Sequence, residues 1–111
     1  MATRSRIATK REDGYESIYC HWDGYPEGVG ATLKEHYTDQ NKIDELIALA
    51  DLSSLGETPA EEHTTSYNRW RDEGTTSKKH KTLEEVKKWA KDQWVEYLYV
   101  WNGTEWETYE V

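Results

Sequence analysis

Phenylalanine is absent from this sequence, which also holds only one cysteine, one methionine and two prolines. A single cysteine excludes an internal disulfide and fits a reducing compartment. The chain has no apolar run of the about 18–20 residues that a membrane span needs. No apolar stretch follows the basic first residues, as it would in a secretory signal. These absences predict a cytoplasmic protein without a membrane anchor.

Hydrophobic residues are also scarce, at 35 %, while charged residues make up 32 %. Low hydrophobicity with high charge is typical of disorder. The six tryptophans and eight tyrosines oppose that interpretation, because each large ring can bury roughly 150–250 Å². A chain of 111 residues is also the usual length of one domain. We therefore expect one folded domain, residues 1–111, with a core of amphipathic aromatic side chains.

The formal net charge is −8. It is unevenly distributed: residues 1–14 carry +2, 15–74 carry −9, 75–91 carry +4 and 92–111 carry −5. Direct binding of nucleic acid is not expected, because neutralising phosphates needs clustered lysine and arginine. An acidic surface serves solubility or engages a basic groove on a partner.

The first elements are predicted to form a β-hairpin. Residues 4–10 and 15–23 are the strands, and Asp13-Gly14 in the turn between them is a strong hairpin signal. In the second strand, side chains alternate between two faces. The expected core face carries Ile18, Cys20 and Trp22.

Helical periodicity follows in three places. Residues 26–37 begin with proline and repeat Val29, Leu33 and Tyr37, although Gly28 and Gly30 weaken the helix. A second helix follows a cap at residues 38–39 and ends near residue 51, with an apolar stripe at Ile43, Leu46, Ile47 and Ala50. A third begins with the capping box of residues 82–85, and its expected apolar face is Leu83, Val86, Trp89, Ala90 and Trp94.

The chain closes with a second predicted hairpin, residues 95–101 and 104–111 about Asn102-Gly103. A two-residue turn would place Trp101 opposite Thr104 and Tyr99 opposite Trp106. Either side could form the core, and we expect the aromatic side to pack against the third helix. Residues 57–82 lack periodicity and are expected to be a mobile loop or insertion. The predicted fold is a small α+β domain, with both hairpins in an antiparallel sheet packed with about three helices.

The densest chemistry lies at residues 19–30. Cys20 and His21 cannot pair, because neighbouring strand residues point to opposite faces. We expect no catalytic residue, cofactor or metal, because ligand spacings typical of metal sites are missing. The glycine-containing turn could hold an anion at the helix start, or it could be structural. The candidates for binding a ligand or partner are Tyr19, His21, Asp23, Tyr25, Glu27, Gly28, Gly30 and His36.

The string Tyr-Cys-His-Trp-Asp-Gly-Tyr-Pro at residues 19–26, with the stretch of residues 47–56, resembles a group of small, uncharacterised phage and prophage proteins. The resemblance covers about two thirds of the chain. It implies an accessory protein of phage origin that acts in the host cytoplasm and interferes with host machinery or defence.

The expected function is therefore stoichiometric binding and inhibition of a host component, as an anti-defence protein would do. Such binding is expected in preference to catalysis. The partner would be a host protein, for example a nucleic-acid-binding defence component, or a small ligand. The alternatives are a nucleotide or small-ligand sponge, or a small enzyme, using residues 19–30. A structural virion component is a further alternative, and self-association stays open.

Overall fold

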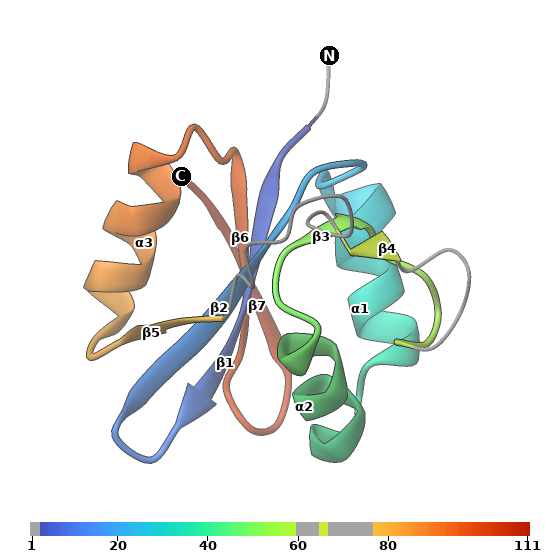
Figure 1. Ribbon diagram of the computed structural model, residues 1–111, viewed down its shortest axis with the longest axis horizontal. Helices are drawn as coiled ribbons and strands as arrows, with labels where there is room; N and C mark the ends of the chain where they lie inside the picture. The colour runs from blue at the N-terminus through green and yellow to red at the C-terminus, as the bar shows by residue number, and fades with distance from the viewer. Residues whose placement is uncertain (1–2, 60–64, 67–76) are drawn as a thin grey trace.

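One β-sheet with helices on both faces forms the framework of the molecule (Figure 1). The computed structural model describes residues 3–59, 65–66 and 77–111. Within these residues the strand order is β4-β3-β2-β1-β6-β7, and β5 pairs with β2 outside this path. The predicted α+β class is confirmed. The strands are β1 (Ser5–Arg11), β2 (Gly14–Cys20), β3 (Leu52–Ser54), β4 (Thr65–Ser66), β5 (Lys78–His80), β6 (Tyr97–Trp101) and β7 (Trp106–Glu110).

The N-terminal hairpin of β1 and β2 is confirmed, with Ile7 opposite Ile18. Its second strand ends at Cys20, before the predicted residue 23, and the backbone becomes left-handed at Asp23, where φ is 57°. The following residue, Gly24, donates its N–H to the carbonyl of Thr3 at 2.8 Å. The early end of the strand leaves Trp22 49 % exposed. The prediction that Trp22 belongs to the core is therefore wrong.

The two hairpins meet through β1 and β6, which run parallel, with Ile7 beside Tyr99. Strands β2 and β3 are also parallel, whereas the pairs β1–β2 and β6–β7 are antiparallel. The pairs β2–β5 and β3–β4 are antiparallel as well. The sheet is thus mixed, and the expectation of an antiparallel sheet fails at β1–β6 and β2–β3. Sequence alternation could not distinguish these arrangements, because it sets the faces of a strand and not its direction.

The C-terminal hairpin has the predicted faces in a different register. Trp101 lies opposite Trp106, and Tyr99 opposite Thr108. The loop holds four residues, because the Asn102 carboxamide oxygen accepts the backbone N–H groups of Thr104 and Glu105, each at 2.9 Å. The predicted two-residue turn is therefore wrong. The shift is two residues, so every side chain keeps its face.

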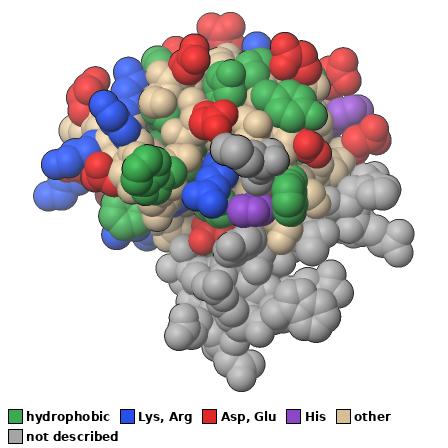
Figure 2. Space-filling view, turned by 90° about the horizontal axis from the view of Figure 1, so that it is seen from above, with side chains coloured by type: hydrophobic (Ala, Val, Ile, Leu, Met, Phe, Trp, Pro, Cys, Tyr) green, Lys and Arg blue, Asp and Glu red, His purple; other side chains and the backbone are tan. Residues whose placement is uncertain are grey.

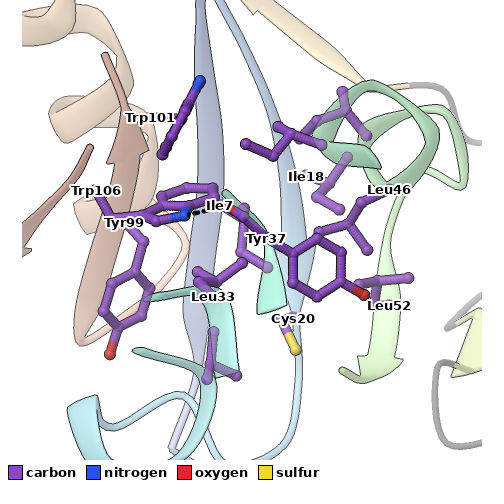
Figure 3. Close-up of a cluster of buried hydrophobic side chains, with 13 residues drawn as sticks. Ile7, Ile18, Cys20, Leu33, Tyr37, Leu46, Leu52, Tyr99, Trp101 and Trp106 are labelled. Carbon is purple, nitrogen blue, oxygen red and sulfur yellow. Dashed lines mark hydrogen bonds between the residues drawn. The ribbon is translucent and has the colours of Figure 1, made fainter. Parts of the chain in front are cut away.

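Three consecutive helical segments cover one face of the sheet: the π-helical turn η1 (Pro26–Gly30), α1 (Ala31–His36) and α2 (Gln40–Ala48). Their predicted apolar residues are buried, including Leu33, Tyr37 and Ile43. Figure 3 shows Tyr37 pointing from the end of α1 towards the strand residues. The core on this face contains Ile7, Ile18, Cys20, Val29, Leu33, Tyr37, Ile43, Leu46, Ile47, Leu52, Tyr99, Trp101 and Trp106.

The third helix, α3 (Leu83–Asp92), covers the opposite face (Figure 1). Its capping box is confirmed, because Thr82 Oγ1 accepts the backbone N–H of Glu85 at 3.2 Å. Val86 of this helix packs with Ala8, Leu98 and Val100 of the sheet in a second, smaller core. The aromatic side of the C-terminal hairpin therefore faces α1 and α2, and the expectation that it packs against the third helix is wrong. Strand β6 is therefore buried on both faces, one in each core, whereas in β7 only Trp106 is buried.

Residues 57–82 were expected to form a mobile loop, and most of that segment, residues 60–64 and 67–76, lies outside the described residues. Two short strands within it, β4 and β5, were not predicted, nor was β3 before it. Strands of two or three residues are too short to show alternation. No helix among the described residues has the length and apolar character required to cross a membrane.

Candidate functional site

Four of the predicted site residues, at the end of β2 and in the turn after it, form two separate hydrogen-bonded pairs. Tyr19 Oη and His21 Nδ1 are joined by a hydrogen bond of 2.7 Å. Tyr25 donates its hydroxyl to Asp23 Oδ1 at 3.3 Å. The Asp23 carboxylate raises the pKa of the exposed Tyr25 phenol above its ordinary value, because it disfavours a second negative charge nearby. Both pairs place polar side chains in or beside the turn. Tyr19 also lines a pocket together with Arg4, Asp51 and Gln93.

Packing requires glycine at position 28 of η1 and leaves little room for a side chain at position 30. A Cβ added to Gly28 would overlap the carbonyl oxygen of Asp23, and one added to Gly30 would lie 3.0 Å from the ring of Tyr99. Tyr99 in turn donates its hydroxyl to the Gly24 carbonyl at 2.6 Å. These contacts support the structural interpretation of the turn. The η1 segment has five residues, and exposed Glu27 places a negative charge in its first turn, which opposes an anion there.

His36 belongs to neither of the two hydrogen-bonded pairs. It ends α1, on the face of the sheet that Ile7 occupies, and its Nε2 lies 3.7 Å from carboxylate oxygens of both Glu35 and Glu57. Within the described part of the chain, no three His, Cys, Asp or Glu side chains are grouped so that they could hold a metal ion. Cys20 is buried, and burial raises the pKa of its thiol to about 12. The thiolate needed for nucleophilic chemistry is therefore disfavoured.

A pocket on the α3 side of the sheet joins the predicted Tyr19 to three residues that the sequence analysis did not select. Its described lining is Arg4, Tyr19, Asp51 and Gln93, and its volume is about 330 Å³. We call it the Arg4 pocket. Asp51 is held at its edge because its Oδ1 accepts the backbone N–H of Tyr19 at 3.0 Å. The volume falls at the small end of the range of ligand-binding clefts, roughly 300–1,000 Å³.

The sheet register explains why this pocket lies beside a buried arginine. Arg6 pairs with Tyr19 across β1 and β2, so both side chains project from the same face. Arg6 is only 3 % exposed. Its Nη1 donates to Gln93 Oε1 at 2.9 Å, which links the guanidinium to the lining of the Arg4 pocket.

The acceptors around Arg6 are neutral: besides Gln93, it donates to Ser17 Oγ at 2.8 Å and to the Ser17 carbonyl at 3.4 Å. Burial lowers the pKa of Arg6 to about 10, and the nearby Asp51 carboxylate partly opposes this shift. The guanidinium therefore remains charged at neutral pH. The pocket lining holds one cation, Arg4, and one carboxylate, Asp51, and the buried Arg6 beside it adds a second cation that favours an anionic group.

Arg6 also belongs to a buried polar chain that continues to β5. Ser17 Oγ and His80 Nε2 are joined by a hydrogen bond of 2.8 Å. Because Oγ accepts from Arg6, its own hydrogen can donate to a neutral imidazole. Burial lowers the pKa of His80, with smaller contributions from Arg6 and Lys78 that outweigh Glu85. Ser17 is fully buried, so this serine–histidine pair is a structural network and offers no accessible nucleophile.

The lowered pKa of His80 predicts a pH-dependent stability. The unfolded chain binds more protons than the folded chain below about pH 7, so the free energy of unfolding falls as the pH drops through that range. We expect wild type to lose up to about 1.4 kcal/mol per pH unit from this group. His80→Gln, which keeps an acceptor for Ser17, should show a flatter profile between about pH 7 and 5 by urea unfolding. Parallel profiles would show that His80 is not responsible.

A signal for these residues was present in the sequence. Arg4 and Arg6 alternate with the apolar Ile7 face of β1, and an arginine within a buried strand needs partners there. Asp51 and Gln93 carry no comparable signal, because they approach Tyr19 and Arg6 only through the tertiary fold.

A scan against protein-family models finds no match, and searches of curated proteins and of solved structures find none either.

Proposed function

We propose that this chain is a stoichiometric binding protein that sequesters a small host ligand in the Arg4 pocket. The ligand class that fits best carries an anionic group and a planar polar ring, as nucleotides do. In this proposal the protein is a phage accessory protein acting in the host cytoplasm, and it withholds the ligand without converting it. The observation that carries the proposal is the Arg4 pocket beside buried, charged Arg6.

Each lining group of the pocket has a role in this proposal. Arg4 offers a guanidinium, which pairs well with carboxylate or phosphate. Tyr19 offers a ring on which a base can stack. Asp51 can accept N–H groups from a heterocycle, and Gln93 can donate from its amide nitrogen because Arg6 occupies its oxygen. Arg6 stabilises the bound anion from below without needing to touch it.

Binding without turnover accords with the burial of two potential nucleophiles, the Cys20 thiol and the Ser17 hydroxyl. Cys20 and Ser17 are both fully buried. A protein that sequesters a ligand needs only sufficient affinity for it and a defined number of sites. In this proposal the pocket held by Arg6, Gln93 and Asp51 is that site.

The test is retention of a metabolite from a bacterial extract. Purified protein is incubated with the small-molecule fraction, washed and denatured, and the released compounds are quantified by mass spectrometry. We expect an anionic compound with a planar ring, approaching one per chain, and at least tenfold less on Arg4→Ala and Tyr19→Ala. Lys10→Ala, which removes an exposed cation from β1, the strand that follows Arg4, is the matched control. No retained compound, or equal retention by Arg4→Ala, contradicts the proposal.

A host protein is a second candidate partner, and the acidic surface favours it. The net charge is −8, and residues 92–111 hold five acidic residues without lysine or arginine. Figure 2 shows many carboxylates on the visible face, with cationic side chains gathered mainly to one side. A nucleic-acid-binding host protein that recognises this surface should be displaced by DNA or RNA and should bind more weakly as salt rises. Salt-insensitive binding would contradict acidic mimicry.

A further inference from the structure

Trp94 is the most exposed large hydrophobic residue of the described chain, at 82 % exposure. It follows the C-terminal end of α3, where Val95 donates its N–H to the carbonyl of Ala90 at 3.0 Å. The backbone at Trp94 is left-handed, with φ at 64°. Helices usually end in this conformation at glycine, because a Cβ is strained there.

The position therefore contradicts two ordinary preferences of a folded chain. A bulky side chain occupies a left-handed helix terminus, and a large indole faces water instead of entering the core. The sequence predicted Trp94 on the apolar face of the third helix, and that prediction is wrong because the helix ends before it. Packing and helix termination give no reason for tryptophan, so the ring is available for a partner.

The surroundings of the Trp94 ring indicate the chemistry of that partner. The ring lines a shallow depression of about 590 Å³ whose other described lining residues are Lys91, Asp92, Val95, Glu96 and Val111. Asp92 and Glu96 are exposed carboxylates on either side of Trp94 in the sequence, and one cation, Lys91, offsets them. We call Asp92, Trp94 and Glu96 the Trp94 surface. An aromatic face beside two carboxylates suits a cation.

The helix that precedes Trp94, α3, already uses this interaction internally. Lys78 Nζ lies 4.4 Å from the centre of the Trp89 ring, and Lys87 Nζ lies 4.3 Å from that of Tyr109. Among the described lysines and arginines, none is placed over the ring of Trp94 in this way. Trp94 thus presents an aromatic face with neighbouring negative charge, and no cation of the described residues occupies it.

We propose that the Trp94 surface docks a partner protein by receiving an arginine or lysine side chain over the indole, with Asp92 and Glu96 pairing the charge. Charge complementarity selects this occupant, since residues 92–111 are entirely acidic among their charged residues. The proposal is independent of the Arg4 pocket. Loss of ligand retention would leave it standing.

The test uses a short glycine-rich peptide with two arginines and a matched peptide with citrulline in place of arginine. Citrulline keeps the shape of arginine and removes its charge. Nuclear magnetic resonance should show chemical-shift changes in the Trp94 indole N–H and in the backbone amides of residues 92–96. We expect affinity in the millimolar range for so small a probe, at least threefold weaker for the citrulline peptide.

Two variants separate the ring from the charges. Trp94→Leu keeps an apolar side chain but loses the aromatic face, and Asp92→Asn with Glu96→Gln keeps the shape but loses the carboxylates. Each variant should weaken binding of the arginine peptide at least threefold, while the amide signals of the rest of the protein stay unchanged. Equal binding by the citrulline peptide or by Trp94→Leu overturns the proposal. A preference for an acidic peptide, or shifts that depend on protein concentration alone, would also overturn it, the latter by assigning the surface to a second copy.

Discussion

Replacing Trp106 by alanine is expected to lower the free energy of unfolding by about 3–5 kcal/mol, the usual cost of removing a large buried aromatic side chain. Trp106 is 8 % exposed, and its ring centre lies 5.5 Å from that of Trp101. Its Nε1 donates to the Tyr37 carbonyl at 2.8 Å, the bond drawn in Figure 3. The substitution removes the packing and leaves that buried carbonyl without this donor.

Trp94→Ala is the matched control, because it removes the same side chain from an 82 % exposed position. We expect it to change stability by less than about 0.5 kcal/mol. Urea unfolding measures the difference, and thermal unfolding should show a fall in Tm of roughly 15–25 °C for Trp106→Ala alone. Similar losses in the two variants would show that Trp106 does not anchor β7 to α1.

Gly28→Ala should destabilise the fold although alanine is the better helix former. Alanine gains up to about 1 kcal/mol from helix propensity. Its Cβ would overlap the carbonyl oxygen of Asp23, which accepts the Val29 N–H at 2.8 Å. Forced overpacking costs about 1–3 kcal/mol, and loss of that hydrogen bond adds roughly 1 kcal/mol. The net expectation is a loss of roughly 2 kcal/mol.

Glu27→Ala, one position earlier in η1 and exposed, is the control for Gly28→Ala. It should stay within about 0.5 kcal/mol of wild type by urea unfolding. Because the clash involves backbone, suppression by shortening a neighbouring side chain is not expected. A Gly28→Ala protein as stable as wild type would show that the turn at Asp23 can relax, and the packing explanation of Gly28 would fail.

Local features of the fold were predictable where one residue pattern determines one structure. The stripe of Ile43, Leu46 and Ile47 predicted α2, and Thr82 with Glu85 predicted the start of α3. Features that depend on distant residues were not. The sequence of neither strand indicates that β1 pairs with β6 in parallel. The Asn-Gly dipeptide predicts a two-residue turn, but hydrogen bonds to the Asn102 carboxamide stabilise a longer loop.

The candidate site divides along the same line. Tyr19 and His21 were identified from one crowded segment, and the structure joins them. The side chains that complete the Arg4 pocket come from three other places in the chain and were missed. Trp22 and Trp94 were assigned to the core because apolar residues usually are. Both are exposed, because β2 ends at Cys20 and α3 ends at Asp92, before these residues.

The parallel contact between β1 and β6 also has a kinetic consequence. Its residues, such as Ser5 and Tyr97, are 92 positions apart in the sequence, so both hairpins can form locally long before they meet. Closing such a loop costs entropy that is recovered only when the central strands pair. Until then β1 keeps one edge open, and the N-terminal hairpin exposes apolar surface. Folding is therefore expected to be slower than for a helical bundle of this size, with its barrier set by the meeting of these two strands.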